Sequence, residues 1–176
     1  LVGVGKVKSQ SIANGSVVKK GQTITLTINN KRHLVNSYAS INRIYKSEDM
    51  KGAEVDLISV FADDMEKVVR IIYLNEEDDL IVKDELVTGE KEALVTWIMV
   101  TPAEAKIIGK NQMELAKDGH RMLLTVIAPG DVEMKLWSNE PLHAFDEPNP
   151  GSMRVGFETH LLANRKNLLK VTLNLI

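Results

Sequence analysis

The sequence contains no cysteine, few aromatic residues and no long hydrophobic run. Without cysteine the chain has no disulfide, no thiolate metal ligand and no thiol nucleophile. No apolar stretch approaches the roughly 18–20 residues that a membrane span requires. The first residues, LVGVG, also lack the basic and long apolar regions of a signal peptide. We therefore expect a soluble chain with no membrane partner.

Charge and length are those of an ordinary globular protein. The 176 residues carry a net charge of −2, with 44% hydrophobic and 26% charged residues. This balance offers no general attraction to nucleic acid, so we expect no nucleic-acid partner. A chain of this length buries about 70% of its unfolded surface, which is enough for a core without covalent staples.

The strongest pattern lies between Lys67 and Thr101. Three apolar runs of strand length are separated by short acidic or glycine-containing breaks: Val68–Leu74, Leu80–Leu86 and Ala93–Val100. Residues 75–79 (NEEDD) suit a hairpin loop, and Gly89 suits a second reversal. The pattern predicts an antiparallel meander at the centre of a sheet.

Shorter strand signals continue along the whole chain. Thr23–Ile28 alternates threonine with apolar residues, which predicts a half-buried strand. Leu1–Lys8 suits an edge strand. Its glycines do not indicate a nucleotide-binding loop, because such a loop requires a following helix and none is expected here. Residues 62–66 favour a turn over a short helix capped by Asp63. Further strands are expected at Leu34–Tyr45, Ala53–Phe61, Ile107–Ile108, Met113–Leu115, Arg121–Ala128, Val132–Trp137, Met153–Leu162 and Leu168–Ile176. We expect Pro129–Asp131 to be a turn that pairs Arg121–Ala128 with Val132–Trp137.

These elements predict an all-β protein, an antiparallel β-sandwich of about a dozen strands. We expect residues 1–176 to form a single β-rich region. Residues 1–52 could alternatively be the end of a preceding sheet domain.

Side chains that could carry chemistry show no catalytic or metal-binding spacing. The four histidines, His33, His120, His143 and His160, form none of the usual metal motifs, and the acidic residues 76–79 lack the pattern of a calcium loop. We therefore expect no metal site and no cofactor. Trp97 and Trp137 sit in apolar runs, so burial is favoured over a sugar-stacking role. Tyr38, Tyr45 and Tyr73 could act as acids or bases, but the two with apolar neighbours are interpreted as core residues.

The best polar group for a ligand surrounds the proline-rich loop Pro141–Gly151. We predict substrate contacts from His143, Asp146, Asn149 and Arg154, since loops on a rigid sheet commonly carry function. The competing interpretation is a structural loop whose Asp and Asn cap its own backbone.

Several segments in this order resemble a known family. They are AEVDL at 53–57, VVRIIYL at 68–74, LIVKDE at 80–85, VTWIMVT at 95–101, the Asp-Gly turn at 118–119 and NPG at 149–151. The chain resembles the C-terminal β-rich part of heparinase II/III-like polysaccharide lyases, over most of residues 53–176, with residues 1–30 similar to the end of a preceding sheet region.

The resemblance implies a parent enzyme that cleaves uronic-acid-containing polysaccharide by β-elimination, in a cleft between an upstream α-helical toroid and the sheet domains. It also implies a periplasmic or extracellular location. The family's catalytic Tyr and His groups lie in segments without a counterpart here, and His33 in KRHLVNS does not match them, so no catalytic residue is assigned.

We expect this chain to support the cleft and to be inactive alone. The alternative is a stand-alone carbohydrate-binding or protein-interaction sandwich. If the loop at 141–151 faced a neighbouring domain, Phe145 would be left exposed and self-association would be possible.

Overall fold

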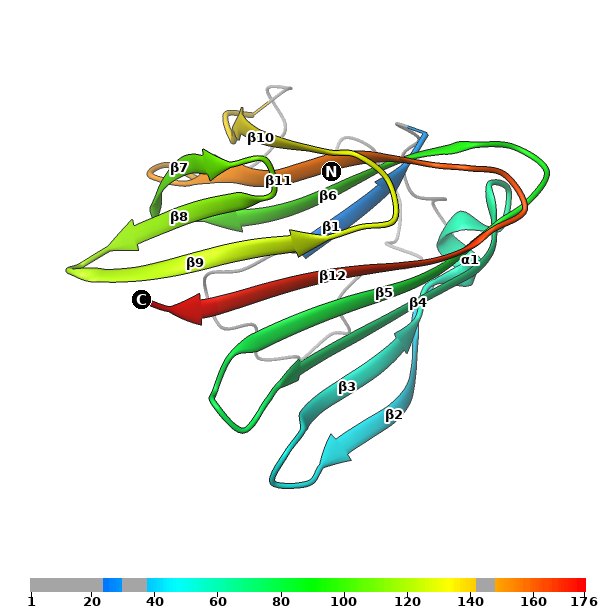
Figure 1. Ribbon diagram of the computed structural model, residues 1–176, viewed down its shortest axis with the longest axis horizontal. Coiled ribbons are helices and arrows are strands. Elements are labelled where there is room, and N and C mark those ends of the chain that lie inside the picture. Colours follow the sequence, from blue (N-terminus) through cyan, green and yellow to red (C-terminus); the bar gives the residue numbers. More distant parts are fainter. Residues whose placement is uncertain (1–23, 30–37, 142–147) are drawn as a thin grey trace, which may run out of the picture.

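The computed structural model describes residues 24–29, 38–141 and 148–176, and in these it forms two antiparallel sheets (Figure 1). The prediction of an all-β sandwich of about a dozen strands is confirmed. No helix among the described residues is long and apolar enough to cross a membrane. The elements are β1 (Ile24–Ile28), β2 (Ser40–Lys46), β3 (Lys51–Asp56), α1 (Ile58–Phe61), β4 (Met65–Leu74), β5 (Leu80–Thr88), β6 (Ala93–Thr101), β7 (Glu104–Gly109), β8 (Gln112–Lys117), β9 (His120–Ile127), β10 (Val132–Ser138), β11 (Met153–Leu161) and β12 (Lys166–Leu175).

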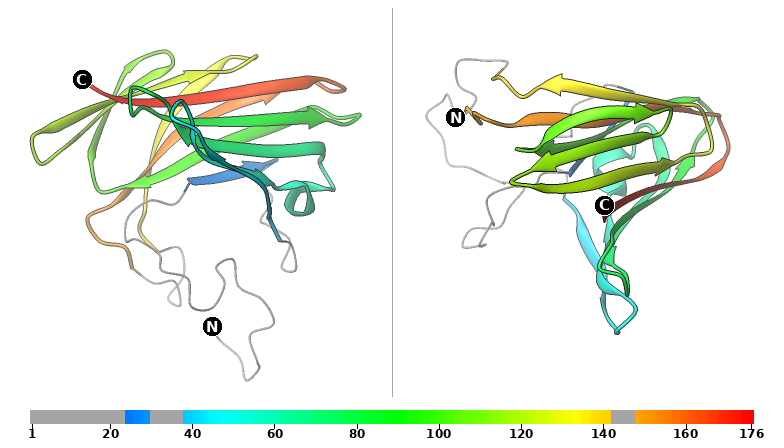
Figure 2. Two further views of the ribbon diagram at one scale, coloured as in Figure 1. Left: turned by 90° about the horizontal axis from the view of Figure 1, so that it is seen from below. Right: turned by 60° about the vertical axis from the view of Figure 1, so that its left-hand side comes forward.

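The larger sheet has eight strands in the order β2-β3-β4-β5-β12-β9-β8-β7, and the smaller has four in the order β1-β6-β11-β10. The smaller sheet lies against one face of the larger one, and the hairpin of β2 and β3 projects beyond it (Figures 1 and 2). One face of the larger sheet is therefore left without a covering layer among the described elements. The predicted strand at Leu1–Lys8 and His33 lie outside the described residues.

The predicted meander is half right. β4 and β5 form a hairpin from Met65 opposite Thr88 to Leu74 opposite Leu80, closed by the predicted loop, in which Asn75 Oδ1 accepts the Asp79 amide at 2.8 Å. β6 does not continue the meander, because the free edge of β5 is occupied by β12 and β6 crosses to the other sheet to pair with β11.

A second crossing between the sheets separates two other strands that were predicted to pair. β9 lies in the larger sheet and β10 in the smaller, so Pro129–Asp131 is a crossing between sheets and not a hairpin turn. Gly130 is required in this crossing, because a Cβ there would lie 2.6 Å from the carbonyl oxygen of His160. The shorter hairpin at Asp118-Gly119 is as predicted, with both residues at positive φ.

The predicted strand at Ala53–Phe61 ends early. β3 stops at Asp56, whose Oδ1 accepts the Ile58 amide at 2.9 Å, and α1 begins there and buries Phe61. This local hydrogen bond competes with strand pairing, so β3 ends at Asp56 although the alternating pattern predicted that it would continue to Phe61. Residues 62–64 form a turn, as predicted.

The core lies between the two sheets and is centred on Trp97 of β6. Trp97 is fully buried, as predicted, and stacks on Phe157 of β11 with ring centroids 5.8 Å apart. Trp137 of β10 is only half-buried, so the predicted burial holds for it in part. Apolar side chains of the larger sheet close the core from the other side: Val68, Val82, Leu86, Leu124, Val126, Leu169, Val171 and Leu173.

Candidate functional site on the outward face of the larger sheet

Strand alternation fixes which side chains of the larger sheet face away from the core. Val68 and Arg70 of β4 and Val82 and Asp84 of β5 are buried and point inward. Their sequence neighbours therefore point outward. This outward face, over β2, β3, β4, β5, β12, β9 and β8, is the candidate functional surface because no described element covers it (Figure 2).

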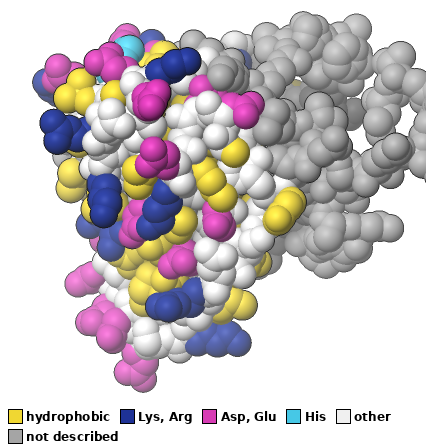
Figure 3. Space-filling model, turned by 90° about the vertical axis from the view of Figure 1, so that its right-hand side faces the viewer, with side chains coloured by type: hydrophobic (Ala, Val, Ile, Leu, Met, Phe, Trp, Pro, Cys, Tyr) yellow, Lys and Arg dark blue, Asp and Glu magenta, His cyan; other side chains and the backbone are white. Residues whose placement is uncertain are grey.

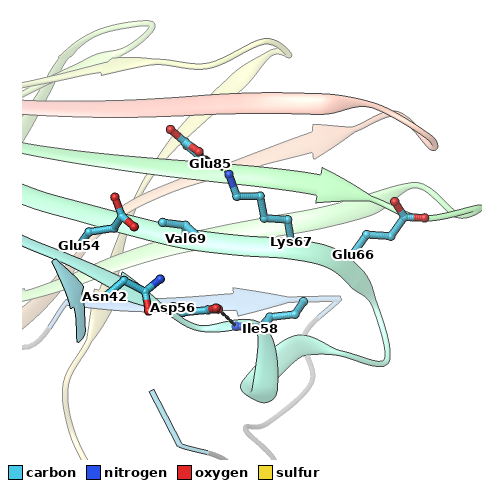
Figure 4. A pocket seen from close by; sticks show the side chains of 8 residues that line it. All are labelled: Asn42, Glu54, Asp56, Ile58, Glu66, Lys67, Val69 and Glu85. Atoms are coloured by element: carbon cyan, nitrogen blue, oxygen red, sulfur yellow. Dashed lines mark hydrogen bonds and ion pairs between the residues drawn. The ribbon is translucent and has the colours of Figure 1, made fainter. Parts of the chain in front are cut away.

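A shallow hollow of about 360 Å³ lies at one end of the outward face (Figure 4). Lys67 reaches across the hollow to Glu85, with Nζ and Oε2 2.6 Å apart and both side chains about half exposed. Asp56 is turned to the backbone of Ile58. The hollow is lined by Asn42, Glu54, Asp56, Ile58, Glu66, Lys67, Val69 and Glu85.

Three of the four carboxylates of this hollow are engaged by the protein. Asp56 accepts the Ile58 amide, Glu85 pairs with Lys67, and Glu54 accepts the hydroxyl of Tyr45 at 3.0 Å. In the described stretches, no group of three or more His, Asp or Glu side chains is placed to hold a metal ion. The hollow therefore offers a polar, mostly acidic recess and not a matched acid and base.

Two tyrosines flank a glycine beside the hollow. Tyr45 of β2 lies opposite Gly52 of β3, which lies opposite Tyr73 of β4. Gly52 has no room for a side chain, because a Cβ would lie 2.0 Å from the carbonyl oxygen of Ile72. The rings therefore stand on either side of a bare stretch of backbone.

Each of these tyrosines carries a cation near its ring. The Arg43 guanidinium carbon lies 5.9 Å from the Tyr45 ring centre, and Lys83 Nζ lies 5.1 Å from the Tyr73 ring centre. Burial, and then the hydrogen bond to Glu54, raise the pKa of the Tyr45 phenol.

The interpretation of the tyrosines with apolar neighbours as core residues is wrong. Tyr38 is 72% exposed, and Tyr45 and Tyr73 are half-buried on the outward face. Their apolar sequence neighbours face the core, and the tyrosines alternate with them. The run VVRIIY contained this signal, since a strand buried on one side places every second residue outside.

A buried ion pair, which was not predicted from the sequence, lies between β4 and β5. Arg70 and Asp84 lie opposite each other on the inward face, with Nε and Oδ1 2.6 Å apart and Nη2 and Oδ2 2.8 Å apart. Their side chains are 6% and 1% exposed. Opposite charges inside two adjacent apolar runs, Arg70 in Val68–Leu74 and Asp84 in Leu80–Leu86, were the available signal. This pair fixes β4 against β5 and does not reach the outward face.

Of the predicted ligand residues, the structure describes two. His143 and Asp146 lie outside the described residues. Asn149 is exposed, and its carbonyl accepts the Ser152 hydroxyl at 2.6 Å. Arg154 of β11 donates from Nε to the Ser138 carbonyl at 2.8 Å, so its guanidinium ties β11 to the end of β10. Both residues lie at the base of the loop, away from the outward face of the larger sheet.

Charges of both signs are intermixed on the surface seen in Figure 3, with hydrophobic side chains between them. Several exposed cations there and elsewhere pair with acids, as Lys110 does with Asp131 and Lys135 with Glu158. The Glu158 carboxylate raises the pKa of Lys135. Surface pairs of this kind contribute little to stability.

A PASTA-domain family model matches residues 1–30. This stretch includes β1, which pairs with β6 inside the smaller sheet of the sandwich. A search of curated proteins found no match.

Among solved structures, 15 chains match the fold. One is a crystal structure of heparinase III, with 12% identity, a TM-score of 0.67, and coverage of 86% of this chain and 23% of that one. Another is a heparinase III gene product with methylated lysines, with 13% identity and a TM-score of 0.60. That match covers 85% of this chain and 22% of the other. This chain thus spans less than a quarter of the length of either, and at this identity the likeness concerns the fold alone. The sandwich described here therefore has the fold of a β-sheet region within heparinase III.

Proposed function

We propose that this chain is an accessory β-sandwich region of a larger polysaccharide-acting protein, where it supports the substrate cleft and does not catalyse the reaction. The observation that carries the proposal is the uneven coverage of the heparinase III match, 86% of this chain against 23% of the other. Nearly the whole sandwich corresponds to a minor part of a longer enzyme. The parent would cleave an acidic polysaccharide by β-elimination and act in the periplasm or outside the cell.

A supporting role agrees with the chemistry of the described residues. β-Elimination needs a base at the sugar carbon that loses its proton and an acid at the leaving oxygen, both within hydrogen-bond reach. The Tyr45 hydroxyl is committed to Glu54, and Asp84 is buried against Arg70. The acid and base are therefore assigned to the rest of the parent, an upstream helical toroid and sheet domain.

An uncovered apolar strip provides a contact surface for that neighbour. Ile41 and Ile44 of β2 lie opposite Val55 and Ala53 on the inward side of the sheet, yet they are 66% and 61% exposed. They sit on the hairpin that projects beyond the smaller sheet (Figure 1). Exposed apolar side chains in such a place are typical of an interface between domains. We assign this strip to contact with the preceding part of the same protein.

The loop at residues 141–151 stays a proposed contributor to the cleft. Asn149 and Arg154 hold its base through Ser152 and Ser138. Substrate contacts from His143, Asp146, Asn149 and Arg154 are part of the proposal, and so is self-association through Phe145 when the neighbour is missing.

The second candidate is a stand-alone carbohydrate-binding or protein-interaction sandwich. The observation that favours it is the pair of outward-facing tyrosines, each with a cation near its ring. Aromatic rings and cations on a flat sheet suit a ligand without any contribution from another domain.

The size of the native polypeptide separates the two candidates. An antibody raised against this chain is used to detect the protein in its source, and the band is digested for mass spectrometry. We expect a polypeptide several times longer than 176 residues, with peptides that map outside this sequence. A native polypeptide of 176 residues would contradict the accessory role and leave the stand-alone module.

A further inference from the structure

Two lysines face each other on the outward face of the larger sheet. Lys83 of β5 lies directly opposite Lys170 of β12, and both are half-buried. Like charges in directly opposed positions destabilise a sheet, because the Cβ atoms of such a pair lie only about 4.5–5.5 Å apart. Nothing in the sandwich core requires two charges at these outward positions.

Within the described ranges, neither lysine is neutralised by an acid. No carboxylate of the described residues lies within ion-pairing distance of Lys83 or Lys170. Two other cations of this face do have such partners: Lys67 pairs with Glu85, and Arg121 pairs with Glu114. The opposed lysines therefore form a local positive site on a chain whose net charge is −2.

The neighbours of this pair suit a sugar. Lys83 Nζ lies 5.1 Å from the ring centre of Tyr73, which holds the ammonium group in place. In the adjacent row across the sheet, Thr172 of β12 lies opposite Thr125 of β9, and Thr125 lies opposite Gln112 of β8. The three residues stand on neighbouring strands about 4.8 Å apart, and Gln112 Nε2 donates to the Thr125 hydroxyl at 3.4 Å. The surface thus combines an aromatic ring, two cations and a row of hydrogen-bonding groups.

We infer that this platform, formed by Tyr73, Lys83, Thr125, Lys170 and Thr172, binds an anionic saccharide. A carboxylate or sulfate group of the sugar would lie between the two ammonium groups, and sugar hydroxyls would bond to the threonine row. The acidic hollow of Glu54, Asp56 and Glu85 lies on the same face. It repels a long, uniformly charged polyanion such as a nucleic-acid duplex, and so favours a short anionic sugar segment.

The choice of an acidic polysaccharide as ligand rests on the proposed function, but the binding site itself does not. A stand-alone module could use the same platform. The native size of the protein tests the accessory role, whereas the experiment below tests only the platform, so the two can fail separately.

The test is a calorimetric titration of the whole chain with four probes: a heparin oligosaccharide, a hyaluronan oligosaccharide, neutral dextran and a short DNA duplex. The sulfated and the carboxylate-only sugars distinguish the two anionic groups. The variant is Lys83→Gln/Lys170→Gln. The matched control is Lys110→Gln/Lys117→Gln, which removes the same charge from exposed positions near β8.

We expect one or both acidic sugars to bind, the platform variant to weaken that binding at least about tenfold, and the control to change it less than about twofold. Thermal unfolding gives a second readout, because removing opposed like charges should leave the variant as stable as the wild type or more stable. The inference is overturned if no acidic sugar binds, if dextran or DNA binds equally well, or if both double variants weaken binding alike.

Discussion

Trp97 shows how one residue holds the two sheets together. Its ring is fully buried against Phe157, and its removal would leave a cavity at the centre of the core. We expect Trp97→Ala to lower the free energy of unfolding by about 3–5 kcal/mol in urea titrations. Trp137→Ala is the control, since that ring is half-buried and should cost less. A loss below about 1 kcal/mol for Trp97→Ala would mean that the ring does not pack as described.

The ion pair between Arg70 and Asp84 gives a second prediction for single residues. Asp84→Ala leaves a buried guanidinium without this carboxylate, so the free energy of unfolding should fall by about 3–5 kcal/mol. Glu85→Ala, at the next position, breaks only the half-exposed pair with Lys67 and should cost at most about 1 kcal/mol. Equal losses for the two variants, measured by the same titration, would contradict the buried position of Asp84.

Tyr45 provides a prediction that depends on pH. Its pKa is raised by burial and by Glu54, so folding favours the protonated phenol. The stabilisation is complete below the ordinary tyrosine pKa and is lost as the pH rises through the raised value. Glu54→Gln should lower the pKa of Tyr45, as followed by ultraviolet absorbance in a Tyr38→Phe/Tyr73→Phe background. An unchanged or higher pKa in that variant would show that Glu54 does not act on this phenol.

At the scale of elements, β11 and β6 approach each other closely at one point. A Cβ on Gly156 would lie 1.9 Å from the Trp97 carbonyl oxygen, which is backbone and cannot turn aside. Gly156→Ala should therefore lower the free energy of unfolding by at least about 2 kcal/mol. Gly109→Ala, where a Cβ meets Gln112 at ordinary contact distances, is the control. If thermal unfolding shows that Gly156→Ala and Gly109→Ala lower the stability by equally small amounts, β11 and β6 are not packed as closely as the register implies.

Strands and some hairpins were predictable from the sequence, but the pairing of strands distant along the chain was not. Alternation in runs such as Val68–Leu74 shows which side chains face the core, and it located β4, β5 and β6 to within a few residues. It carries no information on which strand occupies a neighbouring edge. β5 pairs with β12, a strand from the far end of the chain, and this is why β6 crosses to the other sheet.

At the scale of the whole molecule, the sandwich followed from composition and strand spacing, whereas the outward face did not. Tyr45 and Tyr73 have apolar sequence neighbours and looked like core residues. Only the order of the strands shows that they flank Gly52 on the uncovered side. Lys83 and Lys170 are likewise far apart in the sequence and meet only through the pairing of β5 with β12. A site assembled across strands needs the topology before it can be recognised.

The central claim is that this sandwich supports a polysaccharide-acting protein without performing the elimination itself. The most direct test is to incubate the purified chain with heparin, heparan sulfate, chondroitin sulfate and alginate and to follow the ultraviolet absorbance of unsaturated uronate products. A heparinase serves as the positive control. We predict no increase above a protein-free blank with any substrate. A sustained increase that scales with the concentration of the chain would contradict the account.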